Sequence, residues 1–311
     1  MTISDNLTKF HGRDVVDFES GEPLPDPART ASRLTITYDG PYNEFSDLWA
    51  DFMNSAGVEQ TEAVIIGNWA ELDGGPVPSE QAVRLIVSSA ERLPKLRALF
   101  FGDITSEENE ISWIEQSDVS AFWGAFPNLE EFGIRGGNQL QLGAIKHAKL
   151  KTLKVESGGL PRAVVHEIGA AELPELEHLE IWLGSDSYGG DSRPQDLAGM
   201  LDGKRFPKLV TLALRDCEWA DDLAATLATA PILDRIKRLD ISLGTLGDAG
   251  VDALVASPAV RRLQHLNIAH HYVSDAGVAK LTALGIDVNA ADRKEVDRYG
   301  DEEHRYVAVS E

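Results

Sequence analysis

Large apolar residues recur along the chain in short clusters of the form L-x-x-L-x-L, with polar or small residues between the apolar positions. The clearest copy is Leu209-Val-Thr-Leu-Ala-Leu-Arg-Asp-Cys217. Alternation of apolar and polar residues with period two predicts a β-strand that buries one face. Because the cluster returns along nearly the whole chain, we interpret it as the core of a repeating unit.

The spacing of the clusters gives the size of this unit. The central apolar residues, here called anchors, are Leu34, Val64, Leu99, Phe132, Leu153, Leu179, Leu212, Leu239, Leu266 and Ile286. From Leu34 to Ile286 their mean interval is 28 residues. An interval of this length has room for a helix between one strand and the next.

The intervals between the anchors carry a helical pattern. Phe45, Leu48, Trp49, Phe52 and Met53 recur at i, i+3, i+4, i+7 and i+8, which predicts an amphipathic helix. Shorter stripes of this kind lie in later intervals, at Val83, Ile86, Val87, Ala90, Val119, Phe122, Trp123, Phe126, Val164, Ile168, Leu197, Met200, Leu201, Leu223 and Leu227. A strand followed by a helix, repeated along the chain, predicts an α/β solenoid.

The repeats resemble the ribonuclease-inhibitor-like class of leucine-rich repeats over roughly residues 33–288. The resemblance implies a horseshoe-shaped solenoid, with about ten parallel strands on the concave face and helices on the convex face. An open solenoid end exposes core and strand edge, so the end units are expected to be atypical. We therefore assign residues 1–31 to an N-terminal cap, 32–290 to the solenoid and 291–311 to a C-terminal cap or tail. The alternating residues 306–309 could cover the C-terminal edge.

Composition and charge narrow the class of partner. The chain has 51 acidic and 29 basic residues and a formal net charge of −22. Nucleic acids and anionic membranes require a basic surface, so neither is expected as a partner, whereas a basic protein is favoured. The single cysteine, Cys217, and the absence of a signal peptide or a long apolar run favour a cytoplasmic location without an intramolecular disulfide.

Candidate motifs for chemistry are weak. The stretch 199–205, GMLDGKR, is one residue too short for a phosphate-binding loop and has arginine in place of the hydroxyl residue, so we interpret it as a helix end. His265, His270 and His271 are close in sequence, but no His-x-x-x-His and no cysteine pair accompanies them. We predict no metal and no cofactor. Cys217 lies at a position that leucine-rich repeats bury and is interpreted as a packing residue.

Alternation along each strand assigns a set of side chains to the concave face, opposite the buried leucines. The candidate partner-binding residues on this face are Ile65, Phe100, Arg135, Lys154, Glu156, His178, Glu180, Trp182, Arg215, Arg238 and Asp240. Ile65 and Phe100 are expected to form an exposed apolar floor. An exposed Trp182 among arginines has the composition of an interaction hot spot. The alternative is a solvated strand face with internal ion pairs, each worth about 0–1 kcal/mol.

Three consecutive units carry a pair of glycines shortly after the strand, namely Gly136, Gly137, Gly158, Gly159, Gly189 and Gly190. Glycine permits positive φ and the close approach of a backbone or ligand. Equivalent positions of neighbouring units are adjacent in a solenoid, so these glycines are expected to gather on one edge. This glycine edge, beside Arg135, Glu156 and Trp182, is a candidate ligand site. The alternative is a set of ordinary turns at the strand exits.

The segments 134–143, 156–160 and 180–191 are similar to an uncharacterised family of bacterial cytoplasmic leucine-rich-repeat proteins. Members of that family tend to be encoded beside radical-SAM and ATP-grasp-type enzymes, which implies an accessory role.

Three functional hypotheses follow. The leading one is a non-catalytic scaffold that binds a protein or peptide on the concave face. The second is an accessory subunit that presents a peptide or small substrate to a partner enzyme at the glycine edge. The third is an enzyme, which would need an unrecognised set such as Glu156, His178 and Glu180.

Overall fold

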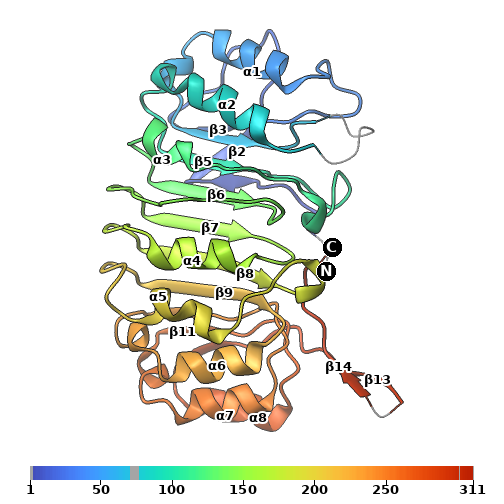
Figure 1. The fold of residues 1–311 in the computed structure, drawn as a ribbon, viewed down its shortest axis with the longest axis vertical. Coiled ribbons are helices and arrows are strands. Elements are labelled where there is room, and N and C mark those ends of the chain that lie inside the picture. Colours follow the sequence, from blue (N-terminus) through green and yellow to red (C-terminus); the bar gives the residue numbers. More distant parts are fainter. Residues whose placement is uncertain (1–2, 71–76, 301, 311) are drawn as a thin grey trace.

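The computed structural model describes residues 3–70, 77–300 and 302–310. Its main feature is a twelve-stranded sheet in which the strands follow one another in chain order, from β1 to β12 (Figure 1). The first pair, β1 and β2, is antiparallel, and every later pair of neighbours is parallel. A sheet that grows by one strand for each repeat is the topology of a solenoid.

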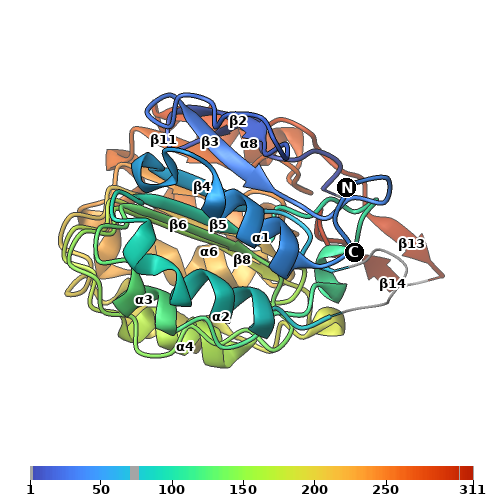
Figure 2. The ribbon, with the colours of Figure 1, turned by 90° about the horizontal axis from the view of Figure 1, so that it is seen from above.

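The strands of this sheet are β1 (Lys9–Phe10), β2 (Arg13–Asp17), β3 (Thr30–Leu34), β4 (Ala63–Ile66), β5 (Ala98–Phe101), β6 (Glu131–Arg135), β7 (Thr152–Glu156), β8 (His178–Gly184), β9 (Thr211–Cys217), β10 (Arg238–Asp240), β11 (His265–Asn267) and β12 (Asp287–Asn289). The α-helices are α1 (Phe45–Asn54), α2 (Glu80–Ser88), α3 (Ala121–Ala125), α4 (Arg162–Ala170), α5 (Ala198–Leu201), α6 (Ala220–Ala228), α7 (Asp248–Ala256) and α8 (Asp275–Thr282). Viewed along the solenoid, α1 to α4 lie together on one side of the sheet (Figure 2). The predicted α/β leucine-rich-repeat solenoid is confirmed.

The anchors form one continuous row across the sheet. Strand pairing aligns eight of them, which are Val64, Leu99, Phe132, Leu153, Leu179, Leu212, Leu239 and Leu266. All eight are buried in the core between the sheet and the helices. Each unit therefore buries its leucines against its neighbours, as expected for a repeat that cannot form a core alone.

The first and last anchors are wrong by two residues. Ser32, rather than Leu34, pairs with Val64, and Val288, rather than Ile286, pairs with Leu266. A shift of two residues keeps the same face of a strand, because side chains alternate with period two. The apolar pattern therefore identifies the buried face of the end strands but not their register.

The predicted helix at Phe45–Met53 is confirmed as α1, and all five of its apolar residues are buried. Later stripes correspond to α2 to α6, which bury Val83, Phe122, Val164 and Leu223 among other residues. The interval between β6 and β7 is too short for this arrangement. Residues 136–151 are extended or turn-like throughout.

The two ends of the chain depart most from the repeat. Before β2, residues 3–10 run across the concave side of the sheet, with the backbone of Ile3 and Leu7 bonded to Ser106 and Asp103. After β12, a separate hairpin of β13 (Asp297–Tyr299) and β14 (Glu302–His304) projects from the body (Figure 1).

Beyond this hairpin the chain returns toward the middle of the solenoid. Residues 305–310, here called the C-terminal strap, follow the loops in which successive strands end (Figure 1). The prediction that residues 306–309 cover the C-terminal edge is wrong. Asp287 and Asn289 of β12, the last strand of the sheet, are exposed.

Candidate functional site

Strand pairing brings the concave-face residues into rows that cross the sheet. The row that follows the anchors consists of Arg33, Ile65, Phe100, Gly133, Lys154, Glu180, Ala213, Asp240, Asn267 and Asn289. A second row aligns Arg135 with Glu156 and Trp182 with Arg215. A third contains His178, Thr211, Arg238, His265 and Asp287. The predicted site residues therefore do share one face, in three adjacent rows.

The apolar part of this face is covered by the N-terminal segment. Ile65 and Phe100 are 0% and 2% exposed, in a cluster with Phe10, Ala31, Ala63 and Ala98, against which Leu7 and Val15 pack. The ring of Phe10 meets that of Phe100 edge-on, with centroids 6.0 Å apart. The prediction of an exposed apolar floor at Ile65 and Phe100 is wrong, because burying this surface under the chain's own residues removes it from water.

A buried carboxylate fixes the N-terminal segment in place. The N–H of Leu7 donates to Asp103 Oδ2 at 3.1 Å, and the side-chain amide of Asn6 donates to the Asp103 carbonyl at 2.8 Å. Arg33 and Arg135 lie 3.4 and 3.5 Å from the Asp103 carboxylate. Burial raises the pKa of Asp103, and Arg135, the Leu7 N–H and Arg33 partly offset that rise.

Charged side chains of alternating sign continue from Asp103 across the middle of the face. Arg135 Nε donates to Glu156 at 2.7 Å, and its Nη1 donates to the carbonyl of Ile104 at 2.7 Å. Lys154 contacts both Glu156 and Glu180, and Arg215 Nη1 lies 2.8 Å from Glu180. The network holds adjacent strands together through ion pairs that are largely shielded from water.

Trp182 is part of this network and is not an exposed anchor. Its indole N–H donates to Glu180 at 2.8 Å, and the Arg215 guanidinium lies 5.2 Å from its ring centroid. Trp182 is 7% exposed, Arg135 3% and Glu156 2%. The prediction that these residues form an exposed hot spot is therefore wrong. Of the two interpretations considered for them, internal ion pairs describe the structure.

The same contacts bear on the enzyme hypothesis. Burial alone would raise the pKa of Glu156, but Lys154 and Arg135 bring it below its usual value. The pKa of Glu180 is also lowered despite burial, by His178, Lys154, Arg215 and Trp182. A general acid or base works best when its pKa lies near the operating pH. The cations around these two carboxylates hold them ionised, which suits a structural role better than proton transfer.

Side chains on the C-terminal half of the concave face are more exposed to solvent. Arg238 is exposed, and its side chain forms no hydrogen bond or ion pair with any described residue. Beside it, the amide of Asn267 donates to Asp240 at 2.8 Å, and that of Asn289 donates to Asn267 at 2.8 Å. Thr211 and His265 flank Arg238 and are half-buried. Four residues outside the candidate partner-binding set thus join this surface, namely Thr211, His265, Asn267 and Asn289. Alternation along the strands does assign His265, Asn267 and Asn289 to the concave face, and the same pattern indicates Thr211.

The six glycines of the glycine edge do gather where the strands end. Residues of neighbouring units fill the space beside them. A Cβ added to Gly159 would lie 2.2 Å from the carbonyl oxygen of Tyr188, and one added to Gly137 would lie 2.3 Å from Ser157 Oγ. Gly159 also forms an antiparallel bridge with Gly184. The glycines allow successive loops to pack closely together.

The C-terminal strap closes the same edge. A Cβ added to Gly158 would lie 2.7 Å from the carbonyl oxygen of Ser310. Val309 N–H donates to Asp216 Oδ1 at 2.9 Å, and Ala308 N–H donates to the Leu243 carbonyl at 2.7 Å. Asp216 is fully buried, and burial raises its pKa well above the usual value, although the Val309 N–H and Arg215 partly offset this.

The three neighbouring histidines have separate structural partners. His271 accepts the N–H of Val273 at Nδ1 and donates from Nε2 to the Ala290 carbonyl. His270 donates to the Tyr306 carbonyl, while His265 pairs with Asp287. Among the described residues, no group of three or more His, Cys, Asp or Glu is placed to hold a metal ion.

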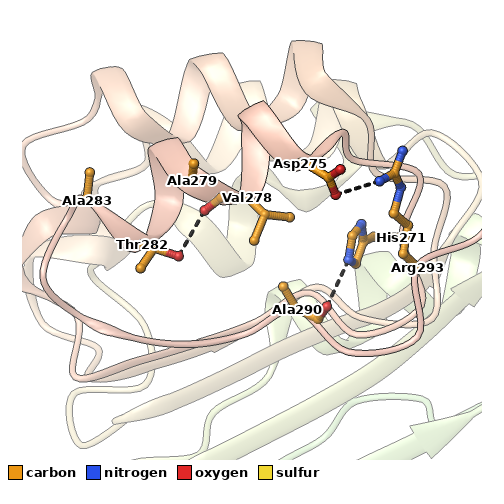
Figure 3. Close-up of a pocket in the computed structure, with 8 residues that line it drawn as sticks. All are labelled: His271, Asp275, Val278, Ala279, Thr282, Ala283, Ala290 and Arg293. Atoms are coloured by element: carbon orange, nitrogen blue, oxygen red, sulfur yellow. Dashed lines mark hydrogen bonds and ion pairs between the residues drawn. The ribbon is translucent and has the colours of Figure 1, made fainter.

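The hollow beside His271 lies at the open end of the last repeat (Figure 3). Its volume is about 680 Å³, and its lining consists of His271, Asp275, Val278, Ala279, Thr282, Ala283, Ala290 and Arg293. Most of these side chains come from α8 and from the loop after β12, where a further repeat would stack. None of the described helices has the length and apolar character needed to span a membrane.

The strand order, the repeated leucines and the two faces define a leucine-rich-repeat protein. A crystal structure of a Bacteroides fragilis protein aligns with the chain at a TM-score of 0.77 and 30% identity, over 85% of this chain and 74% of that one. The chain belongs to the same family as that protein. An internalin of Listeria monocytogenes aligns over the same shares at 11% identity with a TM-score of 0.37, which supports no further conclusion. No protein-family model and no curated protein matches the chain.

Proposed function

We propose that the protein is a non-catalytic scaffold that binds an extended segment of a partner protein on the C-terminal half of its concave face, over β8 to β12. One observation carries the proposal. The N-terminal half of the same face already holds an extended segment, which buries Phe10 against Phe100 and is fixed by Asp103. The rows continue without such a cover over β9 to β12, where Arg238, Asp287 and Asn289 are exposed.

The exposed groups suit a polypeptide. The Arg238 guanidinium has no partner among the described residues, and Thr211, His265, Asn267 and Asn289 supply donors and acceptors for a backbone. An arginine on a concave face binds carbonyl or carboxylate oxygens through its fork of N–H groups. At long range, the net charge of −22 attracts a basic partner and speeds its association.

The test is site-specific cross-linking by the full-length protein. A photoreactive amino acid in place of Thr211 should cross-link one partner from native lysate, and Arg238→Glu should lower the yield by about tenfold or more. Arg261→Glu, which alters an exposed arginine at the end of a short helix away from β10, is the matched control. If the cross-linking yield were the same with Arg238→Glu, with Arg261→Glu and with neither substitution, the assignment of the surface would be refuted.

The accessory-subunit hypothesis makes use of a different surface, the glycine edge. Neighbouring loops and the C-terminal strap fill that edge, which favours the concave face as the first place of contact. If the cross-linked partner is an enzyme and its activity depends on this protein, the accessory role is supported as well.

A further inference from the structure

The C-terminal strap occupies a groove along the strand-exit loops of several consecutive units. Its residues contact Tyr272, Leu243, Asp216 and Gly158 in turn, so the strap runs against the order of the repeats. Ala308 and Val309 are 2% and 3% exposed, which places both side chains inside the molecule. The groove is therefore a site that holds an extended chain.

Most contacts in this groove are made to the main chain of the strap. The Tyr272 hydroxyl accepts the N–H of Tyr306 at 2.8 Å and lies 3.0 Å from its carbonyl, which also accepts from His270 at 3.1 Å. Ala308 and Val309 donate their N–H groups to Leu243 and Asp216. Recognition through the main chain depends little on sequence, as in other sites for extended peptides.

The Arg305 side chain ties the start of the strap to Asp221 at 3.1 Å and to the Thr245 carbonyl at 3.3 Å. Beyond Arg305, few side chains hold the strap. Residues 291–304 lead to it through the β13–β14 hairpin, whose strand residues are exposed apart from the half-buried His304. The two buried side chains of the strap, Ala308 and Val309, are small, and neither belongs to a repeat. The strap can therefore leave the groove without unfolding any leucine-rich unit.

The groove also contains an incompletely satisfied acceptor. Asp216 is completely buried, and its Oδ2 has no hydrogen-bond partner among the described residues. It also forms no ion pair within the described part of the chain. A buried polar atom without a partner is costly, so a ligand that brings a hydrogen-bonding group to this oxygen would bind better than the strap does.

We propose that this groove is a second peptide-binding site, which the protein's own C-terminal strap fills in the absence of a partner. When a partner is present, an extended segment of that partner displaces the strap. That segment carries two adjacent small apolar residues, as Ala308 and Val309 do in the strap. This site is separate from the concave surface proposed above, and the two can fail independently.

The first experiment uses a substitution that releases the strap from the groove in the full-length protein. Val309→Asp places a second carboxylate beside Asp216, and trypsin should then cleave at Arg305 much faster than in the wild type. A fluorescent peptide of residues 305–310 should bind this variant at least about tenfold more tightly than it binds the wild type. The matched control, Val307→Asp, changes the neighbouring half-buried valine and should leave both readouts near wild type.

The position of the groove is tested with two glycines in the Val309→Asp background. Gly158→Ala should abolish binding of the peptide, because the added Cβ would lie 2.7 Å from the position of the Ser310 carbonyl. Gly124→Ala adds a Cβ that meets nothing within 4 Å and should leave binding unchanged.

A second measurement keeps the proposal testable if Val309→Asp does not fold. Limited trypsin treatment of the native wild type should cut at exposed Arg298 and leave the strap held without a covalent link. Excess peptide should then release it. The proposal would be overturned if the peptide did not bind the Val309→Asp variant, or if it did not release the strap from the wild-type protein cut at Arg298. Protection of Arg305 in Val309→Asp, or a dimer that exchanges straps between two copies, would also overturn it.

Discussion

The two ends of the chain use the same device in different ways. Each lays an extended segment over the sheet or its loops and fixes it to a buried aspartate, Asp103 at the N-terminal end and Asp216 at the C-terminal end. Asp103 has Arg33 and Arg135 within 3.5 Å. Asp216 has no ion-pair partner in the described part of the chain, and one of its oxygens accepts no hydrogen bond.

This difference separates a permanent cover from an exchangeable one. A buried charge is costly unless it is paired and hydrogen-bonded, so the Asp103 site is stable only as a complete set of groups. The N-terminal segment also buries Phe10 in an apolar cluster, whereas the strap buries only Ala308 and Val309. We infer that the first cover belongs to the fold and that the second is available for regulation.

The largest expected effect is at Arg135, which serves the N-terminal site. Arg135→Ala removes one of the two cations beside both Asp103 and Glu156, and breaking a buried pair in this way costs about 3–5 kcal/mol. Urea denaturation should show this loss. Arg238→Ala removes an exposed side chain that has no partner among the described residues, so it should change the free energy of unfolding by less than about 0.5 kcal/mol. If both variants lost similar amounts of unfolding free energy, Arg135 would not be the buried, paired residue described here.

A smaller effect distinguishes the two aspartates directly. Asp103→Asn leaves Arg33 and Arg135 without a charged partner at this point and should destabilise the protein by about 1–3 kcal/mol. Asp216→Asn keeps an oxygen to accept the Val309 N–H and removes a carboxyl group whose ionised form burial disfavours. It should therefore be neutral or slightly stabilising, and asparagine tolerates the φ of 55° at this position. Thermal unfolding measures both effects. If Asp216→Asn destabilised the protein more than Asp103→Asn, the contrast drawn between the two aspartates would be wrong.

The smallest effect concerns pH and the C-terminal units. Burial lowers the pKa of His270 and His271 below the usual 6.5. The unfolded chain then binds more protons than the folded one, so the stability that the neutral rings provide is present above pH 6.5 and is lost as pH falls below it. Urea midpoints should decrease from pH 7.5 to 5.5. His271→Asn, whose amide can both accept and donate, should reduce this decrease, and an unchanged pH dependence would exclude His271 as a cause.

Much of the fold could be predicted because it depends on short-range patterns. The anchors from Val64 to Leu266 follow from apolar spacing, and alternation assigns Lys154, Asp240 and Arg238 to the correct face. These features repeat in every unit, so an error in one unit is corrected by the next. At Leu34 and Ile286, where one neighbouring unit is atypical or missing, the register was wrong by two residues.

The accessibility of the candidate site could not be predicted in this way. Leu7 and Asp103 are 96 residues apart, and no local pattern indicates that residues 3–10 cover Ile65 and Phe100. The burial of Arg135 and Trp182 depends on which charged residue lies opposite on the next strand and on the position of residues 103–105. Composition reveals a mixture of aromatic and charged residues but not whether they contact a partner or one another.

Hydrogen exchange of single backbone amides in the native full-length protein tests the central difference most directly. The N–H groups of Leu7 and Val309 both donate to a buried aspartate, so the two amides make the same kind of hydrogen bond. The account predicts that Leu7 exchanges only through global unfolding, whereas Val309 exchanges faster through local release of the strap. Equal protection of the two amides, or faster exchange at Leu7, would contradict it.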